Sequence, residues 1–163
     1  MKIIISSNEV AHGLAYEFQT PSEVRHLATG DYSIDGAEHL ISIERKTLND
    51  LIGCLIEQSE KKKTGKKLVG RERFEAELQR SLSMDYFAVV VEAPLSDIIY
   101  GRYTSKMHPN AALQSLIAFS VRYGKLPFFF CGDRKNGQLV TESLLLKYAR
   151  EVELKLEAMK KRG

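Results

Sequence analysis

The stretch that decides the fold is residues 30–51, which reads GDYSIDGAEHLISIERKTLNDL. Its first part, Gly30–Ile34, has an extended pattern, and the Asp35-Gly36 dipeptide that follows is a strong hairpin-turn signal. The segment His39–Lys46 then returns as a second strand. The stretch therefore predicts a β-hairpin.

A helix is expected to begin directly after this hairpin. Thr47-Leu48-Asn49-Asp50 resembles a capping box, in which the side chains at a helix start satisfy its free amide groups. Apolar residues recur behind it at helical spacing, namely Leu48, Leu51, Ile52, Leu55 and Ile56. Asp50 thus has a structural interpretation as a member of the cap, and this interpretation is compatible with a second role in a functional site.

The rest of the chain alternates apolar strands with helical patterns. Further strands are expected at residues 2–5, 23–28, 86–92 and 128–131. Helices are expected through Ala15 and Phe18, from about residue 70, over 109–123 and over about 141–160. Continuous apolar strands are typical of sheets covered by helices on both faces, and the hairpin adds antiparallel pairing. The sequence predicts an α/β fold with a central mixed β-sheet flanked by helices, as one domain over residues 1–163.

Composition excludes several classes of protein. The 163 residues are 44% hydrophobic and 28% charged, which is ordinary for a globular protein and unlike collagen-like, disordered or disulfide-scaffold chains. The first apolar run is too short for a signal peptide, and no stretch approaches the length of a membrane helix. We therefore expect a cytoplasmic or nucleoid-associated protein that is not secreted and does not enter a membrane. The four histidines form no zinc-binding pattern.

The net charge is only +3, but the charged residues are distributed unevenly along the chain. Residues 1–50 carry eight acidic and four basic residues, whereas residues 60–73 carry seven basic and two acidic ones. Residues 60–69 are expected to form a mobile basic loop. Lysine runs are often only solubilising, but a run beside a functional site favours phosphate binding, which positions a DNA backbone without reading its sequence. The predicted DNA-binding residues are Lys61, Lys62, Lys63, Lys66, Lys67, Arg71 and Arg73.

The hairpin also brings acidic and basic side chains together. Alternate side chains of a strand share a face, so Glu44 and Lys46 project from one face and Arg45 from the other. The hairpin places Asp31 beside them, which gives two carboxylates and one ammonium at one strand end. Mg²⁺ is commonly held by one or two carboxylates together with water and phosphate oxygens. Without Asp31, the same residues would fit a solvated strand end with weak surface ion pairs.

The string Gly30-Asp31-Tyr32 followed by Ile43 to Leu51 resembles the G-D-Y … [V/I]-E-R-K-[S/T]-x-x-D-[L/F] signature of the XPF family of structure-specific endonucleases. The resemblance implies a PD-(D/E)xK-like, restriction-endonuclease-like nuclease core. It implies a Mg²⁺- or Mn²⁺-dependent endodeoxyribonuclease that acts on branched or flap DNA in repair or recombination. By resemblance Asp31, Glu44 and the main-chain carbonyl of Arg45 are metal ligands, and Lys46 is the catalytic lysine. Arg45 and Asp50 would support the site from behind or touch the DNA backbone.

Two departures from the family pattern accompany this resemblance. Ser6-Ser7-Asn8-Glu9 stands where the family usually has D-x-R-E, so Glu9 alone remains as a candidate outer acid. Many members add a helix–hairpin–helix domain, and none is expected within these 163 residues. A homodimer is expected, because the family often works as dimers.

The alternatives are a non-catalytic DNA-binding partner subunit of the same fold, and a junction resolvase or phage nuclease of the same chemistry. Such partner subunits typically lose the E-R-K residues, and their presence here favours an enzyme.

Overall fold

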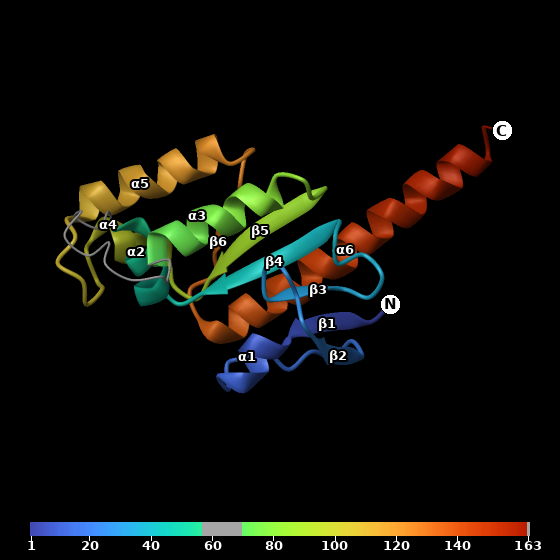
Figure 1. Ribbon diagram of the computed structural model, residues 1–163, viewed down its shortest axis with the longest axis horizontal. Coiled ribbons are helices and arrows are strands. Elements are labelled where there is room, and N and C mark those ends of the chain that lie inside the picture. The colour runs from blue at the N-terminus through green and yellow to red at the C-terminus, as the bar shows by residue number, and fades with distance from the viewer. Residues whose placement is uncertain (57–69, 163) are drawn as a thin grey trace.

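The computed structural model describes residues 1–56 and 70–162, and its centre is a mixed β-sheet (Figure 1). The strands lie in the order β2-β1-β3-β4-β5-β6. They are β1 (Ile3–Ser6), β2 (Ser22–Arg25), β3 (Tyr32–Ile34), β4 (Ile41–Lys46), β5 (Tyr86–Val91) and β6 (Phe128–Phe130). Strand β3 runs antiparallel to β1 and β4, and the other neighbours are parallel. The predicted fold class is confirmed.

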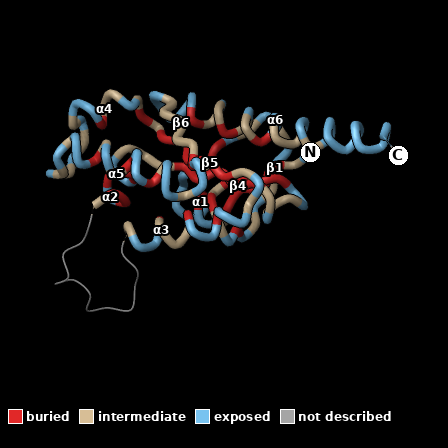
Figure 2. Tube along the Cα trace, turned by 90° about the horizontal axis from the view of Figure 1, so that it is seen from above, coloured by how far each residue is buried: buried red, intermediate tan, exposed pale blue. Residues whose placement is uncertain are grey.

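Helices cover both faces of this sheet. They are α1 (Ser7–Ala11), α2 (Leu48–Leu55), α3 (Gly70–Ser81), α4 (Leu95–Ile99), α5 (Pro109–Arg122) and α6 (Arg134–Lys160). One core joins α2, α3, α4 and α5 to Phe87, Val89 and Val91 of β5. The other core joins α6 to Ala88 and Val90 of the same strand. Strands β4 and β5 are therefore buried on both sides, as the red centre of Figure 2 shows, which accounts for the continuous apolar sequence of β5.

The predicted helix through Ala15 and Phe18 is wrong. Helix α1 spans only Ser7–Ala11, and the chain turns away at Gly13, whose φ is 67°. The following segment is irregular because its aromatic residues pack on the sheet. The Tyr16 and Phe18 rings lie 5.1 Å and 5.3 Å from the Tyr32 ring, centre to centre. Tyr32 is fully buried and packs against the sheet.

The predicted hairpin is confirmed, but its loop is longer than the Asp35-Gly36 signal indicates. The Ala37 amide donates to the Ile34 carbonyl at 2.9 Å and closes the first turn. A second turn follows, in which the Leu40 amide donates to the Ala37 carbonyl at 2.9 Å. Strand β4 therefore begins at Ile41, two residues later than the sequence predicts.

Helix α6 begins earlier than predicted, at Arg134, because Asp133 caps it by accepting the Asn136 amide at 2.7 Å. Mainly its first half packs against the core. Leu145 is fully buried, whereas Met159 is 67% exposed, and the last turns project beyond the rest of the molecule (Figures 1 and 2). The short helix α4 was not predicted. No helix within the described ranges is long and apolar enough to cross a bilayer.

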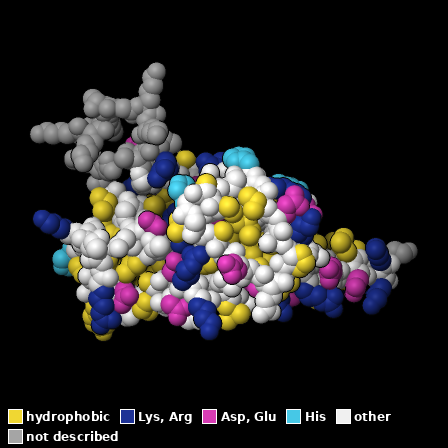
Figure 3. All heavy atoms as spheres, turned by 90° about the horizontal axis from the view of Figure 1, so that it is seen from below, with side chains coloured by type: hydrophobic (Ala, Val, Ile, Leu, Met, Phe, Trp, Pro, Cys, Tyr) yellow, Lys and Arg dark blue, Asp and Glu magenta, His cyan; other side chains and the backbone are white. Residues whose placement is uncertain are grey.

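Charged side chains of both signs are interspersed over the face drawn in Figure 3 and along the projecting end of α6. The predicted basic loop at residues 60–69, with Lys61, Lys62, Lys63, Lys66 and Lys67, lies outside the described residues.

Candidate active site

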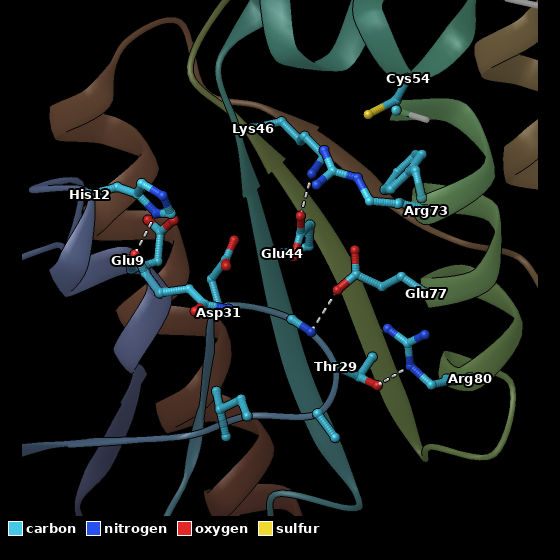
Figure 4. A pocket seen from close by; sticks show the side chains of 16 residues that line it. Glu9, His12, Thr29, Asp31, Glu44, Lys46, Cys54, Arg73, Glu77 and Arg80 are labelled. Atoms are coloured by element: carbon cyan, nitrogen blue, oxygen red, sulfur yellow. Dashed lines mark hydrogen bonds and ion pairs between the residues drawn. The ribbon is translucent and has the colours of Figure 1, made fainter. Parts of the chain in front are cut away.

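A cavity of about 400 Å³ opens at the carboxyl end of β4, between α1 and α3. We call it the β4 cavity. Figure 4 shows side chains entering it from three directions. Asp31, Glu44 and Lys46 come from the hairpin, Asn8, Glu9 and His12 from α1, and Arg73, Glu77 and Arg80 from α3. The structure therefore brings together three of the predicted catalytic residues, together with Glu9 and Arg73.

Main-chain hydrogen bonds fix Asp31 between β1 and β4. Its amide donates to the Ile43 carbonyl at 2.9 Å, and its carbonyl accepts the Ser6 amide at 2.8 Å. One carboxylate oxygen, Oδ2, accepts the Arg45 amide at 2.8 Å. The aspartate is thus held by its neighbours on both sides while its carboxylate lines the β4 cavity.

Gly30 makes this arrangement sterically feasible. Its φ is 73°, and a Cβ atom there would lie 2.1 Å from Ser42 Oγ. That hydroxyl is held in place, because it donates to the carbonyls of Thr29 and Tyr32.

Gly30→Ala is therefore expected to destabilise the protein by about 2 kcal/mol or more, since backbone strain and the clash act together. Chemical denaturation measures this loss. Gly36→Ala is the matched control, because Gly36 also has a positive φ, 79°, but a Cβ there meets no atom within 4 Å. Equal losses for the two variants would show that the clash with Ser42 is unimportant.

Glu44 and Lys46 point from the same face of β4, as the sequence predicts, and form an ion pair between Lys46 Nζ and Glu44 Oε1. Their side chains are only 8% and 14% exposed. Burial lowers the pKa of Lys46, but the charge and hydrogen bond of Glu44 together with the other acidic groups around it more than offset burial and raise that pKa above its ordinary value. Lys46 is therefore a fixed positive charge in the cavity at any pH near neutrality.

The acidic side of the cavity carries surplus negative charge. Burial, together with the charges of Glu44 and Glu9, raises the pKa of Asp31 well above its ordinary range. Burial and the charge of Glu44 likewise raise the pKa of Glu77 to about 7. A divalent cation would relieve this repulsion.

The donor set fits Mg²⁺ or Mn²⁺ bound mainly through oxygen atoms. In the part of the chain that the structure describes, no three His, Cys, Asp or Glu side chains cluster closely enough to hold a metal alone. Asp31 and Glu44 supply two carboxylates, which is the usual protein contribution to a magnesium site completed by other oxygens. The chemistry of these residues therefore matches the predicted cofactor.

Arg45 points to the opposite face of β4 and forms a buried network. Its Nε atom donates to Glu9 Oε2 at 2.7 Å, and its Nη1 atom donates to Glu92 Oε2 at 3.1 Å. The Tyr16 hydroxyl and Arg134 also donate to Glu92 Oε1, at 2.8 Å and 3.2 Å. The Arg45 side chain is 3% exposed, and the side chains of both acids are 9% exposed. Glu9 is therefore the partner of Arg45 at the edge of the cavity, and Arg45 anchors β4 from behind.

Asp50 serves as a helix-cap residue. The Asp50 amide donates to Thr47 Oγ1 at 3.2 Å, and the Thr47 hydroxyl donates to Asp50 Oδ2 at 2.7 Å. Thr47 is thus the N-cap of α2, as predicted. Asp50 also borders a neighbouring cavity of about 370 Å³ that Asp31, Glu44 and Lys46 share. This position is compatible with Asp50 as a helix-cap residue and with Asp50 as a residue of the functional site.

Of the two predicted DNA-binding arginines within the described residues, one contacts the end of α2 and the other lines the β4 cavity. Arg71 donates to the Leu55 carbonyl at 2.9 Å and ties α3 to the end of α2. Arg73 lines the β4 cavity and is exposed.

Sequence reasoning missed four residues of this region, namely Glu77, Arg80, Glu92 and Arg134. The position of Glu92 in the sequence could have indicated it, because Glu92 directly follows the buried strand β5, and that strand ends beside Lys46. Glu77 had no such indication beyond its place on a helix.

Comparison with known proteins identifies the family and the fold of the chain. The model of the ERCC4 domain family matches residues 5–143. The structure of XPF from Aeropyrum pernix superposes with a TM-score of 0.64, covering 96% of this chain and 69% of that chain, at 19% sequence identity. That likeness shows a shared fold. No curated protein matches the chain in sequence. Because the family model covers most of the chain and the fold agrees with it, the chain belongs to the ERCC4 domain family and is an XPF-type nuclease domain.

Proposed function

We propose that this domain is a Mg²⁺- or Mn²⁺-dependent endonuclease that hydrolyses phosphodiester bonds in DNA at branched or flap structures. One observation carries the proposal. The carboxylates of Asp31 and Glu44 and the ammonium of Lys46 converge on the β4 cavity of an ERCC4 domain. Two carboxylates can hold a divalent metal, and a fixed cation beside them can stabilise charge on a phosphate under attack.

In this proposal Asp31 and Glu44 hold the metal, which when bound lowers the pKa of a coordinated water and stabilises negative charge on the phosphate. The main-chain carbonyl of Arg45 is the third oxygen. Successive carbonyls point to opposite sides along Leu40–Lys46. The carbonyls of Leu40 and Lys46 accept amides from the β5 side, whereas the carbonyl of Ile43 accepts the Asp31 amide. The Arg45 carbonyl points the same way as the Ile43 carbonyl, toward Asp31.

Lys46 supplies a positive charge for the phosphate under attack. Its ion pair with Glu44 and its position 5.0 Å from the centre of the Phe74 ring hold the ammonium in the cavity. The same cation can orient the attacking water, because an ammonium has three donors and only some are used by Glu44.

The DNA backbone would lie along the face of α3 that borders the cavity. Arg73 and Arg80 are seven residues apart, two turns of the helix, and both line the cavity. Guanidinium groups bind phosphates well, and such contacts make affinity fall steeply with salt. The lysines predicted to bind DNA, Lys61 to Lys67, precede α3 in sequence and stay part of the proposal.

A non-catalytic partner subunit of the same fold is the alternative. Such a subunit needs no metal ligands, whereas here both carboxylates and the lysine are present and directed into one cavity. The homodimer, the single domain and the choice of branched DNA over linear DNA stay predictions.

The test is cleavage of labelled flap, junction and linear DNA in Mg²⁺ or Mn²⁺. We expect the wild type to cut branched DNA faster than linear DNA, and Lys46→Ala to be slower by about 100-fold. Lys147→Ala, which removes an exposed lysine on α6, is the control and should cut as the wild type does. Tight DNA binding without cleavage in either metal would contradict the enzyme and favour the partner subunit.

A further inference from the structure

Glu77 on α3 makes a hydrogen bond across the cavity that the metal-ligand scheme does not use. Its Oε1 atom accepts the Gly30 amide at 2.8 Å, drawn as a dashed line in Figure 4. Gly30 is the residue immediately before Asp31. The contact therefore links a helix far away in sequence to the backbone that carries the proposed metal ligand.

The loop that carries Asp31 depends on such contacts for its shape. Gly30 has a positive φ and lies close to Ser42, and the amide of the next residue, Asp31, donates to the Ile43 carbonyl on the hairpin side. The α3 side of the loop is held by two side chains one helical turn apart. Glu77 binds the Gly30 amide, and Arg80 Nε donates to Thr29 Oγ1 at 3.1 Å. Only the first of these contacts acts on the backbone itself.

We infer that Glu77 is a positioning residue for Asp31: by accepting the Gly30 amide, it fixes the direction from which the Asp31 carboxylate enters the β4 cavity. This inference rests on the proposed function and adds to it a coupling between α3 and the metal site. The role is that of an acceptor and needs no negative charge. A ligand role would need that charge, and this difference makes the two roles separable.

Replacing the carboxylate with an amide of equal length distinguishes the positioning role from the metal-ligand role. Glu77→Gln keeps an oxygen acceptor at the same distance from the backbone but removes the charge. Glu77→Ala removes the acceptor altogether. Gln79→Ala, at an exposed position on the same helix, is the matched control. Thermal unfolding of every variant is recorded first, and Glu77→Leu, which fills the space without an acceptor, replaces the alanine variant if that one does not fold.

Three measurements follow on the full chain, and the first two involve no DNA. Amide hydrogen exchange by NMR reports whether the Gly30 amide is bonded. Calorimetric titration with Mn²⁺ alone reports metal affinity. Cleavage of flap DNA at low and at saturating metal separates affinity from turnover.

We expect faster Gly30 exchange and about tenfold weaker Mn²⁺ binding in Glu77→Ala, as is usual when a group supporting a metal ligand is lost. Glu77→Gln should match the wild type within about twofold in both, and saturating Mn²⁺ should restore most of the cleavage rate of Glu77→Ala. A metal affinity of Glu77→Gln as weak as that of Glu77→Ala would overturn the inference in favour of a ligand role. Unchanged Gly30 exchange and Mn²⁺ affinity in Glu77→Ala would overturn it outright.

These outcomes are distinct from failure of the proposed function. A wild type that binds Mn²⁺ with the expected variant pattern but cuts no DNA would contradict the nuclease proposal and leave the coupling intact. A wild type that cuts DNA while Glu77→Ala binds Mn²⁺ normally would contradict the coupling alone.

Discussion

Replacing Asp31 with asparagine is expected to slow DNA cleavage by about 1,000-fold. A metal site typically supplies several kcal/mol of transition-state stabilisation, and each 1.36 kcal/mol is a factor of ten in rate. Asparagine keeps an oxygen that can accept the Arg45 amide, which in the wild type bonds to Asp31 Oδ2 at 2.8 Å. The local backbone should therefore survive while the anionic ligand is lost. Single-turnover cleavage of flap DNA measures the loss.

The same substitution should leave the metal-free protein at least as stable as the wild type. Burial and the charges of Glu44 and Glu9 raise the pKa of Asp31 in the folded state. The folded state then binds a proton more tightly than the unfolded one, so wild-type stability falls as pH rises from about 4 toward the raised folded-state value. An asparagine side chain cannot ionise, so the Asp31→Asn variant lacks this loss.

Thermal unfolding in EDTA at several pH values tests this direction of the change in stability with pH. The melting temperature of Asp31→Asn should equal or exceed that of the wild type at pH 7, and added Mn²⁺ should raise only the wild-type value. A variant that is less stable at pH 7 without metal would show that the Asp31 charge is favourable in the fold. An equal Mn²⁺ response in both proteins would place the metal elsewhere.

Replacing Arg45 with methionine is expected to destabilise the fold by about 3–5 kcal/mol, the usual loss when one member of a buried ion pair is removed. Arg45 donates to Glu9 at 2.7 Å and to Glu92 at 3.1 Å, and all three side chains are less than 10% exposed. Methionine leaves two buried carboxylates without their shared cation. Urea denaturation monitored by circular dichroism measures the loss.

Combined variants show whether the loss comes from these charges. Adding Glu9→Gln and Glu92→Gln to Arg45→Met should recover part of the stability, because neutral amides are less costly to bury unpaired than carboxylates. Arg134→Met is the control, since the Arg134 side chain is 46% exposed and its contact with Glu92 is more hydrated. If Arg45→Met and Arg134→Met lose equally little stability, the buried network does not anchor β4.

The central part of the fold and of the site could be predicted because its signals are local. The extended segment, the turn and the return strand lie within residues 30–46, and alternation along β4 places Glu44 and Lys46 together. The cap at Thr47 follows from four consecutive residues. Asp31 required only the hairpin to bring it beside β4.

Features that depend on distant packing were not predictable in this way. The segment around Tyr16 and Phe18 has the composition of a helix, but packing on Tyr32 keeps it irregular. Glu77 reaches Gly30, 47 residues away in sequence, only because α3 lies over the hairpin. Glu9 was expected near the metal as an outer acid, and its partner Arg45 emerged only when α1 and β4 were placed together.

The most direct test of a metal site at Asp31 is the rate of flap-DNA cleavage by the wild type as Mn²⁺ is raised from EDTA-treated protein to saturation. We expect no cleavage in EDTA, a rate that rises and saturates with metal, and a flat response near the background for Asp31→Asn over the same range. Cleavage that persists in EDTA, or an Asp31→Asn curve that overlies the wild-type curve, would contradict a metal site at Asp31.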